Sequence, residues 1–226
     1  MKAFADLFAL LAGPPATIGL LLAVLVIFLT SDRRLSLAAL LVQYVLAGLT
    51  LTRFIEPEVA VLKIVVGILV VPILLLGTRG TDDTPQPQAS DKGRLQILGI
   101  TLGWDAGPLG LPLRILAVLM LFLALTRLMA QFNLPTLPTD LAFVAIWMSS
   151  IGVLGLVLGG GPLRTAASLL TILAGFDLAY AILERSLAVV GLYAALTLLA
   201  GLAFSYLLVV QGLGRSPEQP DEGEPQ

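Results

Sequence analysis

Residues 59–76 of the chain read VAVLKIVVGILVVPILLL, an apolar run interrupted by one charge, Lys63, and one proline, Pro72. An α-helix needs about 20 mainly apolar residues to cross a bilayer. In hydrocarbon every backbone N–H and C=O requires an internal partner, which only helices and closed barrels supply. Barrel strands alternate apolar and polar residues, and this run does not. The segment therefore predicts a membrane-spanning helix.

Six further segments have the same character, and together they predict an all-α, polytopic transmembrane helix bundle of about seven spans. Six spans remain an alternative, because Pro14 and Pro15 leave the first helix short, with residues 4–11 partly inserted ahead of it. The N-terminus carries no cleavage site of the usual kind after its apolar run, so we read it as a retained helix. The additional spans are expected at about residues 15–30, 35–54, 111–129, 141–158, 163–183 and 187–211.

The composition excludes most other classes of protein. Hydrophobic residues make up 58% of the 226 residues and charged residues 12%, about half the charged fraction of soluble domains. The mean hydropathy is +0.98. The net charge of −2 gives no reason to expect a nucleic-acid partner. The chain has neither cysteine nor histidine, so we expect no catalytic residue, no metal site and no cofactor.

The polar stretches divide the chain into four parts. A polar loop begins at Gly77 and continues to about Lys92; an interfacial segment at about 94–109 follows it, because Trp104 favours the headgroup level. The last residues are rich in proline and glutamate and are expected to be disordered. The expected parts are three spans in 1–76, the loop and interfacial segment in 77–110, four spans in 111–212 and an acidic tail in 213–226.

The Lys and Arg distribution predicts the orientation, because loops that face the cytoplasm carry the excess of these residues. With seven spans, eight basic residues lie on one side and four on the other, which predicts an outside N-terminus and a cytoplasmic C-terminus. The richness in Leu, Ala, Gly and Val is typical of a bacterial protein, so the plasma membrane is the expected location. The cytoplasmic set is Arg33, Arg34, Arg79, Lys92, Arg94, Arg114, Arg164 and Arg215, and the outer set is Lys2, Arg53, Arg127 and Arg185.

Lys63 and Asp177 are the candidate ion-relay residues, because both lie inside expected spans. A charge near the middle of a bilayer costs about 2.5–3.5 kcal/mol on insertion scales, so it usually faces the bundle interior and has a purpose. Lys63 could instead extend its long side chain to the interface. Asp177 is too short for that, which favours an internal role, structural or functional. Whether the two residues meet is not decided by the sequence.

Other polar residues in the spans are expected to contribute to helix packing. Gln43, Tyr44, Ser149 and Ser150 are candidates for hydrogen bonds between helices, worth at most about 1–2 kcal/mol each in membranes. Pro72 lacks an N–H for the carbonyl of residue 68 and predicts a kink, although membrane helices often tolerate such a proline. The GLVLG sequence at 155–159 is a pattern that permits close helix approach.

Three stretches resemble a known family: DRRLSLAALLVQ at 32–43, VLKIVVGILVVPIL at 61–74 and LRTAASLLTILAG at 163–175. Together they are similar to membrane component E of group 4 hydrogenase complexes, a relative of the K subunit of respiratory complex I and the C subunit of multisubunit cation/proton antiporters. The resemblance covers about half the chain and is mostly hydrophobic pattern. It implies a small helical bundle at the junction between a redox arm and ion-pumping modules.

The chain departs from that family at one position. The family usually has a glutamate where this chain has Leu173, whereas Asp177 lies one helical turn later, about 6 Å along the axis. A relay shifted by one turn is consistent with this spacing.

These observations favour a non-catalytic subunit of an ion-translocating complex, whose partners would be the lipid bilayer and other membrane subunits. A stand-alone transporter or channel is an alternative, although no inverted repeat is evident. The other alternative is a scaffold or assembly protein, whose buried charges only fix helix packing.

Overall fold

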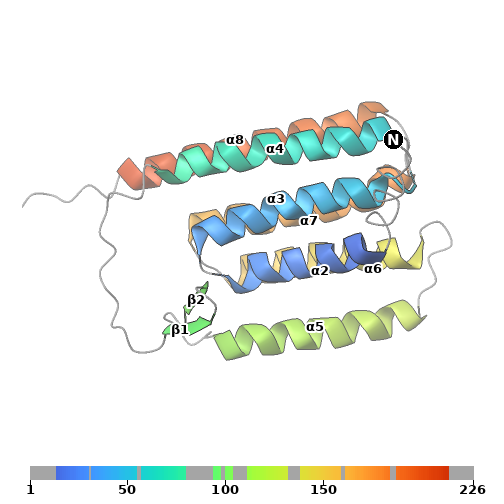
Figure 1. Cartoon of the computed structure of the whole chain (residues 1–226), viewed down its shortest axis with the longest axis horizontal. Coiled ribbons are helices and arrows are strands. Elements are labelled where there is room, and N and C mark those ends of the chain that lie inside the picture. The colour runs from blue at the N-terminus through green and yellow to red at the C-terminus, as the bar shows by residue number, and fades with distance from the viewer. Residues whose placement is uncertain are drawn as a thin grey trace, which may run out of the picture.

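Seven helices form the body of the computed structural model, which describes residues 14–30, 32–54, 57–79, 94–97, 100–103, 111–131, 138–158, 161–183 and 187–213. Helices that follow one another run in opposite directions, so that the chain enters and leaves the described bundle at opposite ends (Figure 1). The helices are α2 (Pro14–Leu29), α3 (Arg33–Leu51), α4 (Pro57–Arg79), α5 (Leu111–Gln131), α6 (Thr139–Val157), α7 (Pro162–Leu183) and α8 (Leu187–Leu213).

Length and composition make this a polytopic transmembrane bundle. Six of the described helices, α3 to α8, are long and apolar enough to cross a bilayer. The seventh, α2, is apolar but has only 16 residues, about 24 Å at 1.5 Å per residue, against a hydrocarbon thickness of about 30 Å. The expected all-α transmembrane bundle is confirmed, and the choice between six and seven spans depends on α2.

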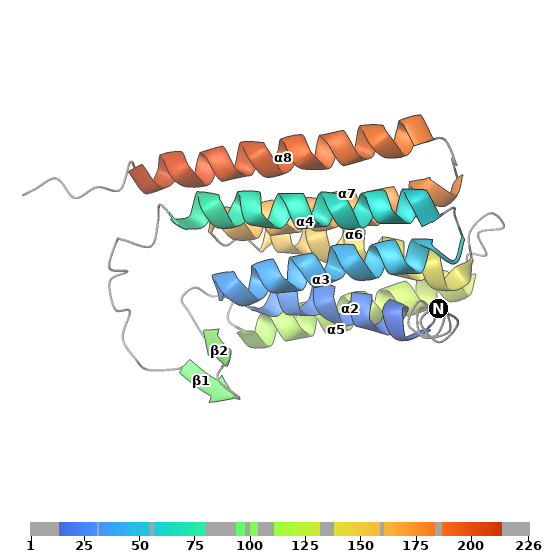
Figure 2. The ribbon, with the colours of Figure 1, turned by 45° about the horizontal axis from the view of Figure 1, so that its top comes forward.

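The helices form two layers of three. One layer contains α2, α3 and α4 side by side, and the other contains α6, α7 and α8 (Figures 1 and 2). Each helix of the first layer faces its counterpart in the second: α2 on α6, α3 on α7 and α4 on α8. The most fully buried side chains, among them Leu40, Tyr44, Met148 and Leu170, form the core. Helix α5 lies at the edge, against α6 and α2, and only 6% of its apolar stretch is buried.

Two helix ends differ from the sequence expectation by three residues, and the others differ by at most two. The second span was expected to reach residue 54, but α3 ends at Leu51, and Thr52 closes it by donating its N–H to the carbonyl of Gly48 at 3.2 Å. The third span was expected to end at residue 76, with a loop from Gly77, but α4 continues to Arg79. The reason is packing, because Gly77 lies against the backbone of Ser205 in α8.

A small antiparallel hairpin lies in the connection between α4 and α5, where the sequence suggested only an interfacial segment. Strand β1 (Arg94–Ile97) pairs with β2 (Ile100–Gly103), with Arg94 opposite Gly103. Several expected features lie outside the described residues: most of the polar loop (residues 80–93), Trp104 of the interfacial segment, the acidic tail from residue 214 and residues 4–11.

Helices α3 and α4 pack closely because Gly67 has no side chain. A Cβ at residue 67 would overlap the Cβ of Tyr44, and the nearest ring carbon of Tyr44 would be only 2.8 Å away. Gly155 of the predicted close-approach pattern likewise lies against the Ser168 side chain of α7. The first contact fixes the position of Tyr44 relative to α4.

Gly67→Ala should therefore lower the stability of the bundle by about 1–3 kcal/mol, the usual cost of overpacking a core. The matched control is Gly191→Ala in α8, because nothing lies within 4 Å of a Cβ there; it should be neutral or raise stability by up to about 1 kcal/mol. Thermal unfolding in one detergent, followed by the fraction of protein that stays monodisperse, compares the two. Equal melting temperatures for both variants would contradict the described α3–α4 contact.

Because the natural chain has no cysteine, single cysteines can report the topology directly. Pro15→Cys and Thr139→Cys should react with a membrane-impermeant maleimide from one side, and Gly161→Cys and Gln211→Cys from the other. All four positions are exposed near helix ends. Labelling of Pro15→Cys from the same side as Gly161→Cys would show that α2 does not cross the membrane.

Candidate functional site

Lys63 of α4 and Asp177 of α7 form an ion pair inside the bundle. The Lys63 Nζ lies 2.5 Å from Oδ2 of Asp177 and donates a second hydrogen bond, at 3.3 Å, to the carbonyl of Ala174. The Lys63 side chain is 2% exposed and that of Asp177 is 14% exposed. Lys63 thus turns into the bundle, and does not extend along its helix to the interface as the alternative interpretation allowed.

The antiparallel course of the helices brings the two residues to one level. Lys63 lies six residues after Pro57, where α4 begins, and Asp177 lies six residues before Leu183, where α7 ends. At 1.5 Å per residue, each is about 9 Å from its helix end. Because α4 begins at the end of the bundle where α7 finishes (Figure 1), the pair lies nearer to that end than to the other.

A small cavity of about 10 Å³ adjoins the ion pair. A cavity of this size is at the lower limit for holding one water molecule. Its polar walls are the ion pair, Tyr44 of α3 and Thr197 of α8; apolar side chains, Leu62, Val66, Val190 and Ala194, complete it. Four helices therefore each contribute a polar side chain to the lining of this one cavity.

Tyr44 is the most unusual of these groups. Its side chain is 2% exposed, and its hydroxyl has no hydrogen-bond partner within the described part of the chain. A buried hydroxyl without a partner is uncommon in native structures. The hydroxyl of Thr197 donates to the carbonyl of Tyr193 at 2.8 Å, and its oxygen stays available as an acceptor.

A second polar contact lies deeper in the bundle, between the two layers. The Thr171 hydroxyl of α7 contacts Oε1 of Gln43 at 3.3 Å and also donates to the carbonyl of Ala167 at 2.8 Å. The Gln43 Nε2 is buried and has no hydrogen-bond partner among the residues described. Gln43 precedes Tyr44, so the two contacts are adjacent along α3.

The remaining candidates stand apart from this site. Ser149 donates to the carbonyl of Ala145 in its own helix at 2.9 Å and faces Gly175 of α7. Ser150 is partly buried in α6. Pro72 is exposed within a helix that continues through it, so the kink stays a prediction.

Thr171 and Thr197 are site residues that the sequence analysis did not single out. The available signal was weak: each is a lone hydroxyl in an apolar helix, where threonine commonly bonds the carbonyl one turn earlier. Within the described ranges, no three acidic residues come together in a way that could hold a metal ion. The site is thus a charge pair with hydroxyl and amide neighbours.

Comparisons of the chain with protein-family models, curated proteins and solved structures gave no match. The candidate site is therefore assigned a role from its own geometry.

Loss of one member of the pair should be much more harmful than loss of both. Lys63→Met and Asp177→Leu each leave a buried charge without a partner, which costs about 3–5 kcal/mol, whereas apolar replacement of a whole buried pair is often neutral. We expect both single variants to melt well below the parent in detergent and the double variant Lys63→Met/Asp177→Leu to recover most of the loss.

The matched control is Arg127→Gln, because Arg127 is an exposed charge on α5 and its loss should leave the melting temperature unchanged. Additive losses in the double variant would contradict the ion pair.

Proposed function

We propose that the protein is a non-catalytic integral membrane subunit of a proton- or cation-translocating complex of the respiratory or hydrogenase type, in the bacterial plasma membrane. The observation that carries the proposal is the Lys63–Asp177 pair, buried in an apolar bundle beside a water-sized cavity. Ionisable residues inside membrane spans are rare and commonly mark ion pathways or proton relays.

The geometry supports a relay that moves one proton at a time. A proton arriving at the Asp177 carboxylate neutralises it and removes the partner of the Lys63 ammonium. The unpaired ammonium then releases a proton, because a charge without a partner in a low-dielectric interior is costly. Transfer of the remaining proton from the carboxyl group to the amine, along the existing hydrogen bond, restores the pair. One proton has entered and one has left.

Tyr44 provides a group through which protons enter or leave this relay. Its hydroxyl and the ion pair line the same cavity, and a hydroxyl can both donate and accept a hydrogen bond. A single water molecule in the cavity would connect the Tyr44 hydroxyl to Asp177. Gln43 and Thr171, the next polar contact along α3, would extend the polar route toward the middle of the bundle.

Two further features support a subunit. Helices α5 and α8 leave most of their apolar stretches uncovered, with 6% and 17% buried, and such faces are available to lipid and to neighbouring subunits. The resemblance to component E of group 4 hydrogenases, and to the related complex I and antiporter subunits, supports the same role, with Asp177 in the helix where those proteins usually have a glutamate. The proposed orientation has the N-terminus outside and the C-terminus in the cytoplasm.

A scaffold or assembly protein is the second candidate. It is favoured by the position of the ion pair, which joins α4 of one layer to α7 of the other, two helices whose backbones have no extensive contact with each other. In that case the charges would hold the layers in register and would carry no ion. A stand-alone transporter would place the same pair on its own transport path.

The first experiment is a gentle purification of the tagged chain from its native membrane, with mass spectrometry of what accompanies it. We expect antiporter-like or hydrogenase-like membrane subunits in stoichiometric amounts. A lone homo-oligomer would overturn the subunit role and leave the transporter and the scaffold.

The second experiment separates a relay from a scaffold. The double variant Lys63→Met/Asp177→Leu preserves the packing without the charges, so the complex should still assemble. A relay predicts that ion-gradient formation in vesicles falls on the order of a hundredfold, the size of effect of removing a positioned proton-transfer group. Arg127→Gln is the control. Full gradient formation by an assembled double variant would favour the scaffold.

A further inference from the structure

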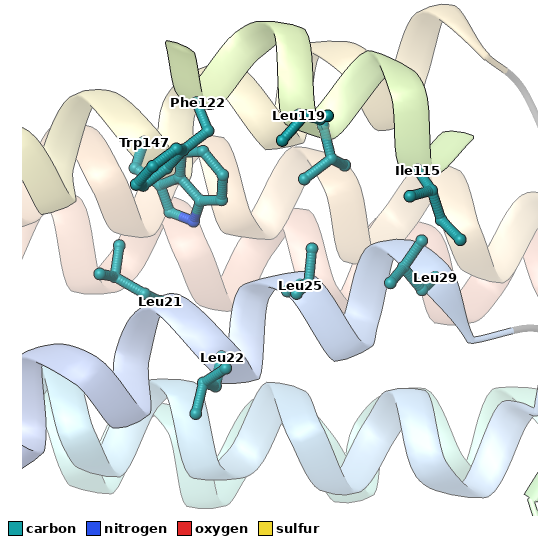
Figure 3. A pocket seen from close by; sticks show the side chains of 9 residues that line it. Leu21, Leu22, Leu25, Leu29, Ile115, Leu119, Phe122 and Trp147 are labelled. Carbon is teal, nitrogen blue, oxygen red and sulfur yellow. The ribbon is translucent and has the colours of Figure 1, made fainter. Parts of the chain in front are cut away.

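An apolar groove lies between α2, α5 and α6, away from the ion-pair site. Its volume is about 340 Å³, within the range of about 300–1,000 Å³ typical of small-molecule sites. Leucines of α2 form one wall, and Ile115, Leu119 and Phe122 of α5 face them. Trp147 of α6 lies beside Phe122 (Figure 3). Leu22, Leu119 and Phe122 are exposed, at 55%, 51% and 42%, so the groove opens on the outer surface of the bundle.

The groove follows the helix axes and ends at a helix terminus. Leu29 and Ile115 lie at one end, and Trp147 and Phe122 lie at the other (Figure 3). Leu29 is the last residue of α2, and Ile115 is in the first turns of α5. From Leu21 to Leu29 the groove extends about 12 Å along α2 at 1.5 Å per residue. Its elongated form and almost entirely apolar lining match an extended hydrocarbon chain.

Two arginines lie at the end marked by Leu29 and Ile115. Arg114 immediately precedes Ile115. Arg164, near the start of α7, donates a hydrogen bond to the carbonyl of Phe28, and its guanidinium lies 5.4 Å from the centre of the Phe28 ring. Phe28 immediately precedes Leu29, so both arginines adjoin residues that line the same end of the groove.

These two arginines have N–H groups without hydrogen-bond acceptors in the described part of the chain. The Nε of each is buried without a hydrogen-bond partner among the described residues, and neither forms a salt bridge within that part of the chain. Two neighbouring guanidinium groups without a carboxylate provide charge-assisted, fork-shaped donors for a phosphate group. Basic pockets between membrane helices on the cytoplasmic side bind anionic headgroups in this way.

We propose that the groove binds an anionic phospholipid, with one acyl chain along α2 and α5 and the phosphate held by Arg114 and Arg164. The positive charges of the two arginines, at the end of the groove marked by Leu29 and Ile115, select an anionic headgroup. The apolar walls accept any acyl chain of sufficient length. In the proposed orientation this lipid lies in the cytoplasmic leaflet. It fills the gap beside α5, the helix that the rest of the bundle covers least.

The test uses Trp147 as a reporter, because it lines the groove and the chain has only two tryptophans. In a Trp104→Phe background, the full-length protein is reconstituted into phosphatidylcholine vesicles that contain a small fraction of brominated lipid, a contact quencher. Brominated phosphatidylglycerol should quench Trp147 at a mole fraction at least about fivefold lower than brominated phosphatidylcholine, the factor expected for a basic residue near an anionic headgroup.

The double variant Arg114→Gln/Arg164→Gln should abolish that preference. The control Arg127→Gln, which removes a charge of α5 away from the end of the groove where the arginines lie, should retain it. Inorganic phosphate added to the vesicles should have no effect; if it removes the preference, the arginines bind free phosphate and the lipid site is wrong. Equal quenching by the two lipids in the parent would overturn the proposal. Absence of quenching by either lipid would also overturn it, because the groove would then hold no lipid chain.

Should the double arginine variant fail to fold, the comparison of the two lipids in the parent still decides the matter. It is then repeated at high salt, which screens charges and should reduce the preference.

Discussion

A charge inside an apolar helix bundle has to be paired, and this requirement links the two layers of the protein. Lys63 and Asp177 meet at 2.5 Å in surroundings that otherwise consist almost entirely of aliphatic and aromatic side chains. Either charge alone would carry a desolvation cost of several kcal/mol. The contact between them therefore sets the relative height of α4 and α7, and with it the register of one three-helix layer on the other.

The neighbouring features follow from that contact. Gly67 lets α3 approach α4 closely enough to place the Tyr44 side chain in the core, and the Tyr44 hydroxyl then shares a cavity with the pair. The second polar contact, between Gln43 and Thr171, crosses the same two layers farther from the end of the bundle. The arrangement thus provides two polar levels between helices that are otherwise joined by apolar packing. A relay and a structural lock both use such an arrangement, and they differ in whether the charges move.

The sequence predicts much of the fold, because apolar runs of spanning length have almost no alternative to a helix in hydrocarbon. It also identifies Lys63 and Asp177, since few ionisable residues lie within the spans. The sequence does not predict the contact between them, because Lys63 and Asp177 lie 114 residues apart in the chain and meet only through the alignment of two helices. The predicted end of α4 was wrong for a similar reason. Gly77 is typical of a loop, but here it lets α4 pack closely on α8. Arg114 and Arg164 were interpreted only as topology signals, because their position at one end of the same groove depends on how the helices assemble.

The direct ion pair between Lys63 and Asp177 can be measured within the bilayer. Solid-state NMR of the full chain in lipid bilayers, with ¹⁵N-labelled lysine and ¹³C-labelled aspartate, tests it through the dipolar coupling between the Lys63 Nζ and the Asp177 Cγ. Lys63 is the only lysine expected in a span, and a Lys63→Arg sample identifies its signal. A direct ion pair predicts a strong coupling, as for atoms joined by a single hydrogen bond, that is absent in Lys63→Arg. A Lys63 signal without coupling to any carboxylate would contradict it.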